Sequence, residues 1–203
     1  MTLRVLLSLG LLTALLSSCS GIPGIPGVGA PNRPYLAGLG VTARTGFSNP
    51  AEASSFWDGD SVNGASLIRI NRDDQKAYFY KGGELVGVSP ISTGNATHIT
   101  PPGRFKVTEK DIDHESSAYG VIKNVATGQV VNEDADTRKH KAGPGEVFVH
   151  APMPNFLRFN YGIGMHAGFL PGFPASHGCV RMPEQMAVKF FEHAPLGTPV
   201  IVE

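Results

Sequence analysis

The chain has 203 residues, of which 41% are hydrophobic and 8% aromatic, enough apolar material for the core of one folded domain. Its 17 Lys and Arg residues balance 17 Asp and Glu residues, so the formal net charge is zero and no basic stripe indicates a nucleic-acid partner. The 25 glycines and 16 prolines exceed the usual combined share of roughly 12% and favour a turn-rich β domain over a helical one.

The first 18 residues are typical of an export signal. Arg4 precedes an apolar run from Val5 to Leu16 that is too short to span a bilayer stably. The run ends in Leu16-Ser17-Ser18-Cys19, which resembles the lipobox of bacterial lipoproteins, where the chain is cut before the cysteine and the thiol is lipidated. We therefore expect residues 1–18 to be a lipoprotein signal peptide and Cys19 to be the lipidated residue.

The residue after this cysteine, Ser20, resembles the outer-membrane sorting type and not the aspartate type retained at the inner membrane. The resemblance implies a protein of the cell envelope that is lipid-anchored and faces the periplasm, at the outer membrane where the envelope has two. Two cysteines cannot form a disulfide framework. The alternative of a single Cys19–Cys179 bridge conflicts with lipidation of Cys19.

Residues 19–34 combine the lipidated cysteine with a Gly- and Pro-rich stretch that reads as an extended tether, which reaches roughly 3 Å per residue if it is polyproline-like. Residues 35–65 form an N-terminal extension, in which Phe56 and Trp57 are expected to cover part of the domain. The folded domain itself is expected over residues 66–203.

Strand patterns dominate this domain. Residues 76–80 and 85–88 are rich in β-formers and are joined by a Gly-Gly turn, which predicts a hairpin. Other strands are expected at 67–70, 104–108, 145–150 and 198–202, and one convincing helix at 184–192, preceded by Pro183.

Two polar segments, 109–117 and 132–141, are most simply interpreted as solvated loops. His114 and His140 lie in them and are expected to be surface residues.

The chemistry concentrates between Gly162 and Arg181. Cys179 is a candidate nucleophile, and a thiol acts as thiolate, so it needs a base or a positive environment nearby. His166, His177 and Arg181 lie within fifteen residues of it. Spacing alone leaves the base open, because His177 and Cys179 point to the same face of an extended run. Three zinc ligands, His166, His177 and Cys179, are an alternative whose spacing is not usual for zinc.

Ser176-His177-Gly178-Cys179-Val180-Arg181, with Gly164-Met165-His166 upstream, resembles the catalytic signature of the L,D-transpeptidase family. Segments 75–86, 90–94, 100–105 and 197–200 are also similar to that family. The resemblance covers about residues 66–203 and implies a mainly β fold, a β-sandwich or barrel with one or two short helices. The chain departs from the pattern in the short interval between His166 and Ser176, and in Ala167 where many members have glycine.

Carried over to this sequence, the resemblance makes Cys179 the nucleophile and His166 the general base and later general acid, oriented by a backbone carbonyl near Ala167. The backbone N–H groups of His177, Gly178 and Cys179 would form an oxyanion hole. Ser176, Arg181 and Tyr161 are candidates for substrate contacts. Arg181 would serve equally well to brace the loop, and core packing is the simpler interpretation of Tyr161.

The activity that the resemblance implies is that of a peptidoglycan L,D-transpeptidase. The cysteine forms a thioester with a stem tetrapeptide and passes it to an amine acceptor in cell-wall cross-linking or remodelling. The expected partners are peptidoglycan stem peptides and, through the N-terminal lipid, the membrane; no cofactor, metal, nucleic acid or required protein partner is implied.

Two alternatives remain open: hydrolysis of the same thioester, which is L,D-carboxypeptidase activity, and a non-catalytic wall-binding lipoprotein. The intact His166, His177 and Cys179 count against the second. The sequence leaves the acceptor open among another stem peptide, an envelope protein and water.

Overall fold

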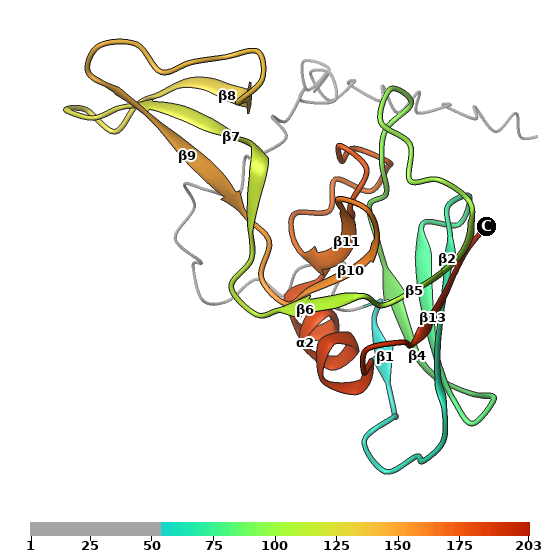
Figure 1. Cartoon of the computed structure of the whole chain (residues 1–203). Coiled ribbons are helices and arrows are strands. Elements are labelled where there is room, and N and C mark those ends of the chain that lie inside the picture. Colours follow the sequence, from blue (N-terminus) through green and yellow to red (C-terminus); the bar gives the residue numbers. More distant parts are fainter. Residues whose placement is uncertain (1–53) are drawn as a thin grey trace, which may run out of the picture. The chain divides into compact units, whose positions relative to one another are not determined.

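The computed structural model of the protein describes residues 54–203, a strand-rich domain (Figure 1). In chain order the strands are β1 (Phe56–Trp57), β2 (Ser66–Asn71), β3 (Lys76–Lys81), β4 (Glu84–Pro90), β5 (Gly103–Lys106), β6 (Glu109–Asp111), β7 (Glu115–Asn124), β8 (Val130–Asp136), β9 (Glu146–Pro152), β10 (Phe156–Asn160), β11 (Ile163–Ala167), β12 (Val180–Met182) and β13 (Pro199–Val202). The helix described with them is α2 (Glu184–His193). The predicted signal peptide, residues 1–18, and the tether, residues 19–34 with Cys19, lie outside the described residues.

The strands form three sheets. A six-stranded sheet has the order β1-β4-β3-β2-β13-β5, a four-stranded sheet the order β12-β11-β10-β6, and a three-stranded sheet the order β8-β7-β9. Within residues 54–203 none of these sheets closes on itself. The predicted mainly β fold class is therefore confirmed, in the form of open sheets.

The predicted hairpin is confirmed and lies in the six-stranded sheet. β3 and β4 pair antiparallel and end on the pair Lys81–Glu84. The two residues between them, Gly82 and Gly83, have φ of 58° and 89°, which the tight two-residue turn requires and glycine adopts without strain. On the other side of β3, β2 alternates buried Ile68 and Ile70 with more exposed neighbours, as a half-buried strand should.

The core lies between the six-stranded and four-stranded sheets and includes α2. Burying one large apolar side chain contributes roughly 1.5–3 kcal/mol. Phe79 of β3 meets Phe190 of α2 edge to face, with ring centroids 5.0 Å apart. Trp57 packs on Phe79 at 5.3 Å, so the expectation that Trp57 covers part of the domain is confirmed, whereas Phe56 is about half exposed. No helix within residues 54–203 has the length and apolar character needed to cross a membrane.

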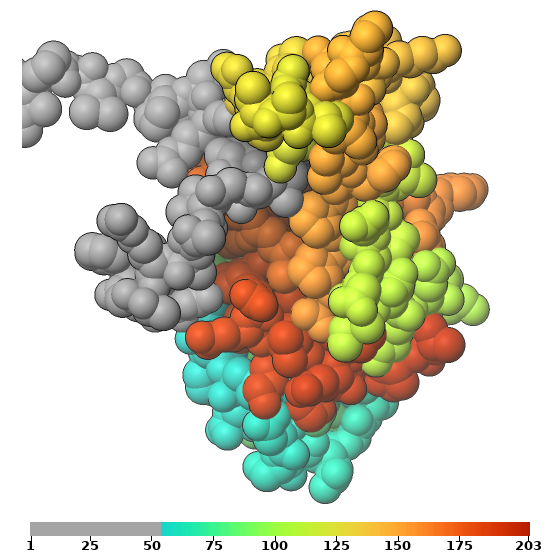
Figure 2. Space-filling model, turned by 90° about the vertical axis from the view of Figure 1, so that its left-hand side faces the viewer, coloured from blue at the N-terminus to red at the C-terminus, as the bar shows by residue number. Residues whose placement is uncertain are grey.

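The interpretation of the two polar segments as loops is wrong. Residues 109–117 contain β6 and the start of β7, and residues 132–141 contain most of β8. β6 is half-buried along its length and β8 is mostly exposed, so neither shows the apolar alternation by which a strand is recognised in sequence. Figure 2 shows the three-stranded sheet, in yellow and orange, at the opposite end of the domain from the N-terminal strands in cyan.

β6 and β10, which belong to the four-stranded sheet, continue into β7 and β9. β6 pairs with β10, and β7 pairs with β9. Between the two ladders Asn155 N donates to Ile112 O at 2.9 Å, and Met153 N donates to His114 O at 2.7 Å. One long two-stranded ribbon therefore connects the four-stranded sheet to the three-stranded sheet, and we call residues 112–155 the arm.

Candidate active site

Two parallel strands, β11 and β12, position the candidate catalytic side chains. Their register pairs His166 with Arg181. Paired residues on parallel strands point to the same face, and side chains alternate along each strand. The preceding pair, Met165 and Val180, is buried in the core, so His166 and Arg181 lie on the opposite face. Cys179 stands two residues before Arg181, which puts its side chain on the face of His166.

Cys179 is partly exposed and lies against the backbone of β11 and the turn before it. Its thiol donates weakly to Gly162 O at 3.8 Å. Burial of the sulfur among protein atoms raises the pKa of the thiol, while the amide of Gly164 and the positive charges of Arg181 and Arg158 oppose that rise. Burial therefore favours the neutral thiol over the thiolate.

His166 is buried, with 4% of its surface exposed. Its Nδ1 lies 2.8 Å from Ala167 O, and because a carbonyl oxygen only accepts, Nδ1 carries the hydrogen and Nε2 of the neutral ring carries the lone pair. Burial lowers the pKa of His166 to about 4, and the charges of Arg181 and His114 act in the same direction. The Nε2 atom is buried and bonds to no other described residue.

These two groups suit general-base catalysis. A buried, neutral imidazole whose Nε2 is an acceptor can take a proton from a thiol on the same face of the sheet, and the Ala167 carbonyl stabilises the imidazolium that forms. The carbonyl near Ala167 was the orienting group that the family resemblance implied.

The turn before Cys179 is held by its own hydrogen bonds. Ser176 is fully buried; its Oγ accepts from Gly178 N at 3.0 Å and donates to Cys179 O. Gly178 has φ of 115°, which disfavours any other residue, and its carbonyl accepts from Thr100 Oγ1 at 2.8 Å. The amide of Gly178, one of the three expected in the oxyanion hole, is thus engaged inside the turn. Contact of Ser176 with substrate stays a prediction.

His177 packs against the arm and the segment before β5. Its ring is stacked on Tyr119 of β7, with centroids 4.2 Å apart, and meets His98 edge to face at 4.6 Å. Its Nε2 lies 3.6 Å from Asp134 Oδ1 of β8. Burial lowers the pKa of His177, with His98 and Arg181 acting in the same direction and Asp134 against it.

Arg181 is 4% exposed and holds the loop between His166 and Ser176. Its Nη1 donates to Phe169 O at 3.3 Å and its Nη2 donates to Ala175 O at 3.0 Å, near the two ends of that loop. The sequence left bracing and substrate binding equally open. In the structure Arg181 braces the loop through these two hydrogen bonds. Binding of a substrate carboxylate stays a prediction.

Tyr161 is the most exposed large hydrophobic residue within residues 54–203, at 94%. It occupies the turn between β10 and β11 with a positive φ of 42°, and its carbonyl accepts from Arg158 Nη1 at 2.9 Å. The simpler interpretation of Tyr161 as a core residue is therefore wrong. Its neighbour Gly162 contacts the thiol, which places Tyr161 at the rim of the site.

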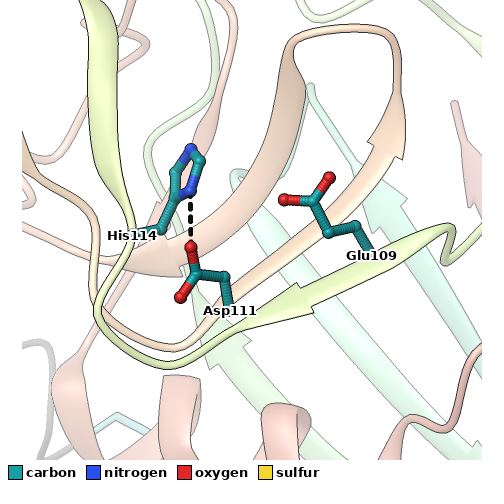
Figure 3. Close-up of side chains that lie close together, drawn as sticks. All are labelled: Glu109, Asp111 and His114. Atoms are coloured by element: carbon teal, nitrogen blue, oxygen red, sulfur yellow. Dashed lines mark hydrogen bonds and ion pairs between the residues drawn. The ribbon is translucent and has the colours of Figure 1, made fainter.

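Within residues 54–203, one group of three side chains has metal-ligand atoms within 4.8 Å of one another: Glu109, Asp111 and His114 (Figure 3). His114 Nδ1 is 2.9 Å from Asp111 Oδ2, but Arg158 Nε already donates to Glu109 Oε2 at 2.8 Å. A guanidinium in that position repels a cation, so the group does not suit a metal. His166, His177 and Cys179, the alternative zinc ligands, do not form such a group.

Three residues that contact the site were not predicted from the sequence to belong to it: His98, Thr100 and Asp134. Each contacts His177 or Gly178 from a segment more than forty residues away in the chain. No spacing rule relates such distant positions, and Asp134 also lay in a segment interpreted as a loop.

Residues 65–202 match the model of one protein family, described as YkuD, the L,D-transpeptidase catalytic domain. A comparison with curated proteins finds no match.

Among solved structures, similar folds include an L,D-transpeptidase from Mycobacterium smegmatis, at TM-score 0.53 and 16% identity over 69% of this chain and 59% of that one. An L,D-transpeptidase from Xylanimonas cellulosilytica gives TM-score 0.51 and 21% identity over 70% and 62%. A cysteine-to-serine mutant of an Enterococcus faecium L,D-transpeptidase gives 0.50 and 21% over 70% and 50%. The chain thus spans less than two thirds of each of these proteins, and at such identities the likeness concerns the fold.

Proposed function

The chain belongs to the L,D-transpeptidase catalytic domain family over residues 65–202, and from that premise we propose that it is a cysteine-dependent peptidoglycan L,D-transpeptidase. The observation that carries the proposal is the state of the base. His166 is buried and neutral, with its Nε2 lone pair available and its Nδ1 hydrogen held by Ala167 O, on the sheet face that also carries Cys179.

The proposed reaction begins with acylation. As the Cys179 sulfur attacks the carbonyl of an L-residue next to the terminal D-residue of a stem tetrapeptide, His166 Nε2 takes the thiol proton. The backbone N–H groups of His177 and Cys179, on either side of the Gly178 amide that Ser176 Oγ already engages, stabilise the oxyanion, each by roughly 3 kcal/mol. His166 then gives the proton to the departing amine, so the terminal D-amino acid leaves and a cysteinyl thioester remains.

The second half-reaction returns the enzyme to its starting state. An amine acceptor, in family terms usually the side-chain amine of a neighbouring stem peptide, attacks the thioester carbonyl and loses a proton to His166. The thiolate leaves and recovers that proton. Water in place of the amine would yield a free tripeptide, so the same site performs hydrolysis if the acceptor is excluded.

The activity is tested by incubating the purified protein with a stem tetrapeptide and an amine acceptor and identifying the products by mass spectrometry. We expect the cross-linked product, and neither product nor acyl-enzyme from Cys179→Ala. His166→Gln should lose activity by about 10²–10⁴-fold, the usual contribution of general-base catalysis.

Two other outcomes decide against transpeptidation. Free tripeptide alone would identify an L,D-carboxypeptidase. No product, together with no carbapenem adduct on Cys179 by intact mass, would favour the non-catalytic wall-binding protein. The family resemblance implies such an adduct.

We further propose that the domain acts in the cell envelope, attached through lipid on Cys19 and facing the periplasm. The support is the order of Arg4, the apolar run from Val5 to Leu16 and Cys19 in the sequence. A lipid anchor with an extended tether suits a substrate that is an immobile polymer at some distance from the membrane.

A further inference from the structure

The arm carries a bulge that faces the candidate active site. Between the pairs Glu115–Pro152 and Gly120–His150, β7 advances five residues (115 to 120) while β9 advances two (152 to 150). Bulges next to active sites commonly re-aim a side chain. Here the extra residues, which have no partner on β9, include Tyr119, which pairs with Asp136 of β8 and whose ring stacks on His177.

The bulge is itself held in place. Ser116 Oγ accepts from the amide of Tyr119 at 2.9 Å, and His150 Nδ1 donates to Ser116 O at 2.7 Å. Arg138 Nη2 donates to the Tyr119 hydroxyl at 2.9 Å. The position of the Tyr119 ring is therefore determined from its backbone and from its hydroxyl end.

Arg138 is fixed in turn by β8. Its Nε and Nη2 donate to the two carboxylate oxygens of Asp136 at 2.8 and 2.7 Å, a bidentate pair that fixes the orientation of the guanidinium. Asp134 lies two residues before Asp136, and its Oδ1 is 3.6 Å from His177 Nε2. Residues of two neighbouring strands of the arm thus contact one imidazole.

His177 is the side chain through which the arm contacts the turn that precedes the nucleophile. Of its neighbours in this turn, Ser176 is buried with its hydroxyl engaged inside the turn, and Gly178 has no side chain. The turn is short and hydrogen-bonded, so a displacement of the His177 ring moves the backbone on either side of it. The amides of His177 and Cys179 are those assigned to the oxyanion hole in the proposed function, and the Gly178 amide between them is held by Ser176 Oγ.

We propose that Tyr119 and Asp134 are positioning residues for the acyl transfer: by clamping the His177 ring between the arm and His98 they hold the 177–179 backbone in place and keep this second imidazole away from the sulfur. The proposal rests on the proposed function. It explains why a chain with two histidines near one cysteine has His166 as the base, since the ring of His177 is held among residues of other segments.

The test compares two rates at Cys179 in Tyr119→Leu and Asp134→Asn. Acylation by a stem tetrapeptide needs an ordered oxyanion hole, and we expect its kcat to fall by about 10- to 100-fold, the order expected when such donors are displaced. Alkylation by iodoacetamide needs only the thiolate and should stay within about threefold of the wild-type rate. A loss that appears in KM alone would show that these residues bind substrate, and would overturn the proposal.

Two control variants make the comparison specific. Tyr119→Phe keeps the ring and loses only the hydroxyl, so it should retain most of the stacking and most of the activity. Glu133→Ala removes an exposed acid of the same strand as Asp134 and should match the wild type. If Tyr119→Leu does not fold, Asp134→Asn alone tests the positioning role, because this substitution preserves the shape of the side chain.

Hydrogen exchange of the amides at 177–179 separates this proposal from the proposed function. Exchange there should be faster in Tyr119→Leu and Asp134→Asn than in the wild type or Glu133→Ala, whether or not the protein is a transpeptidase. Unchanged exchange in both variants would overturn the positioning role. Faster exchange in a protein that forms no thioester would overturn the proposed function and leave the clamp established.

Discussion

At the scale of single residues, the chemistry depends on two groups whose pKa values move in opposite directions for one reason. Both Cys179 and His166 are surrounded by protein atoms, and loss of water penalises whichever form is charged. The pKa of the thiol rises and that of the imidazole falls, so the resting pair is neutral. The proton then moves during the attack and not before it.

This state predicts the pH profile of Cys179. Alkylation by iodoacetamide follows the thiolate, so its rate should keep rising through about pH 9 without a plateau between about pH 5 and 8. Because His166 is protonated only below about pH 4, kcat/KM for the tetrapeptide should fall only as the pH drops through that value. Rates of modification of the Cys179 peptide are measured by mass spectrometry.

His166→Gln is the control for that profile. It removes the base and should leave the alkylation profile nearly unchanged above pH 5, because the imidazole it replaces is already neutral there. A plateau at pH 5–8 that disappears in His166→Gln would instead reveal a thiolate–imidazolium pair and contradict the neutral assignment.

At the scale of elements, the packing of β10 on β11 requires a glycine. A Cβ at Gly164 would meet ring atoms of Phe156 at 2.4 Å and Leu157 O at 2.7 Å. Phe156 is fully buried and its ring lies 6.2 Å from that of His166. The missing side chain therefore brings the Phe156 ring close to the base, while the amide of Gly164 faces the thiol.

We predict that Gly164→Ala destabilises the domain by about 1–3 kcal/mol, the usual cost of overpacking a core, because neither a buried ring nor a backbone carbonyl can give way easily. Chemical denaturation measures the change. Gly162→Ala is the matched control, since a Cβ there meets no atom within 4 Å and should change the free energy of unfolding by less than about 0.5 kcal/mol. Equal stability of the two variants would refute the packing argument.

At the scale of the whole molecule, the N-terminal part of the described chain joins the domain at a fixed point. Asp60 accepts from Trp57 Nε1 at 2.7 Å and pairs with Lys189 at 2.9 Å and His193 at 3.1 Å, both on α2. The Trp57 hydrogen bond and the Lys189 ammonium lower the pKa of Asp60 to about 2. The carboxylate therefore stays charged at any physiological pH and keeps residues 57–60 fastened to the helix.

The anchoring proposal makes a prediction at this scale. In envelope fractions the wild-type protein should sediment with membranes, while Cys19→Ala should shift to the soluble fraction, because the proposed anchor is the lipid on that residue. Cys179→Ala is the control and should remain with the membranes. Membrane association of Cys19→Ala equal to that of the wild type would exclude lipid on Cys19 as the anchor.

Prediction from the sequence succeeded for elements whose pattern is local. β2, the β3–β4 hairpin, α2 and β13 each follow from apolar periodicity with Gly or Pro at their ends. It was wrong for β6, the start of β7 and most of β8, because these polar segments become strands by pairing with distant strands and show no apolar alternation of their own. It was also wrong about the core packing of Tyr161 for a related reason: an aromatic residue in a turn can be exposed or buried depending on what folds over it.

The sequence by itself determined which reactive residues are present and the fold class. It supplies a Ser-His-Gly-Cys run, an upstream histidine, glycines where the backbone needs positive φ, and enough strand patterning for a mainly β domain. These depend on neighbours within a few residues. Only the tertiary structure decided where the two imidazoles lie, which carbonyls Arg181 holds, and that a bulge in the arm reaches His177. These contacts join segments tens of residues apart, and their energy comes from burial and hydrogen bonds that form only once the three sheets are assembled.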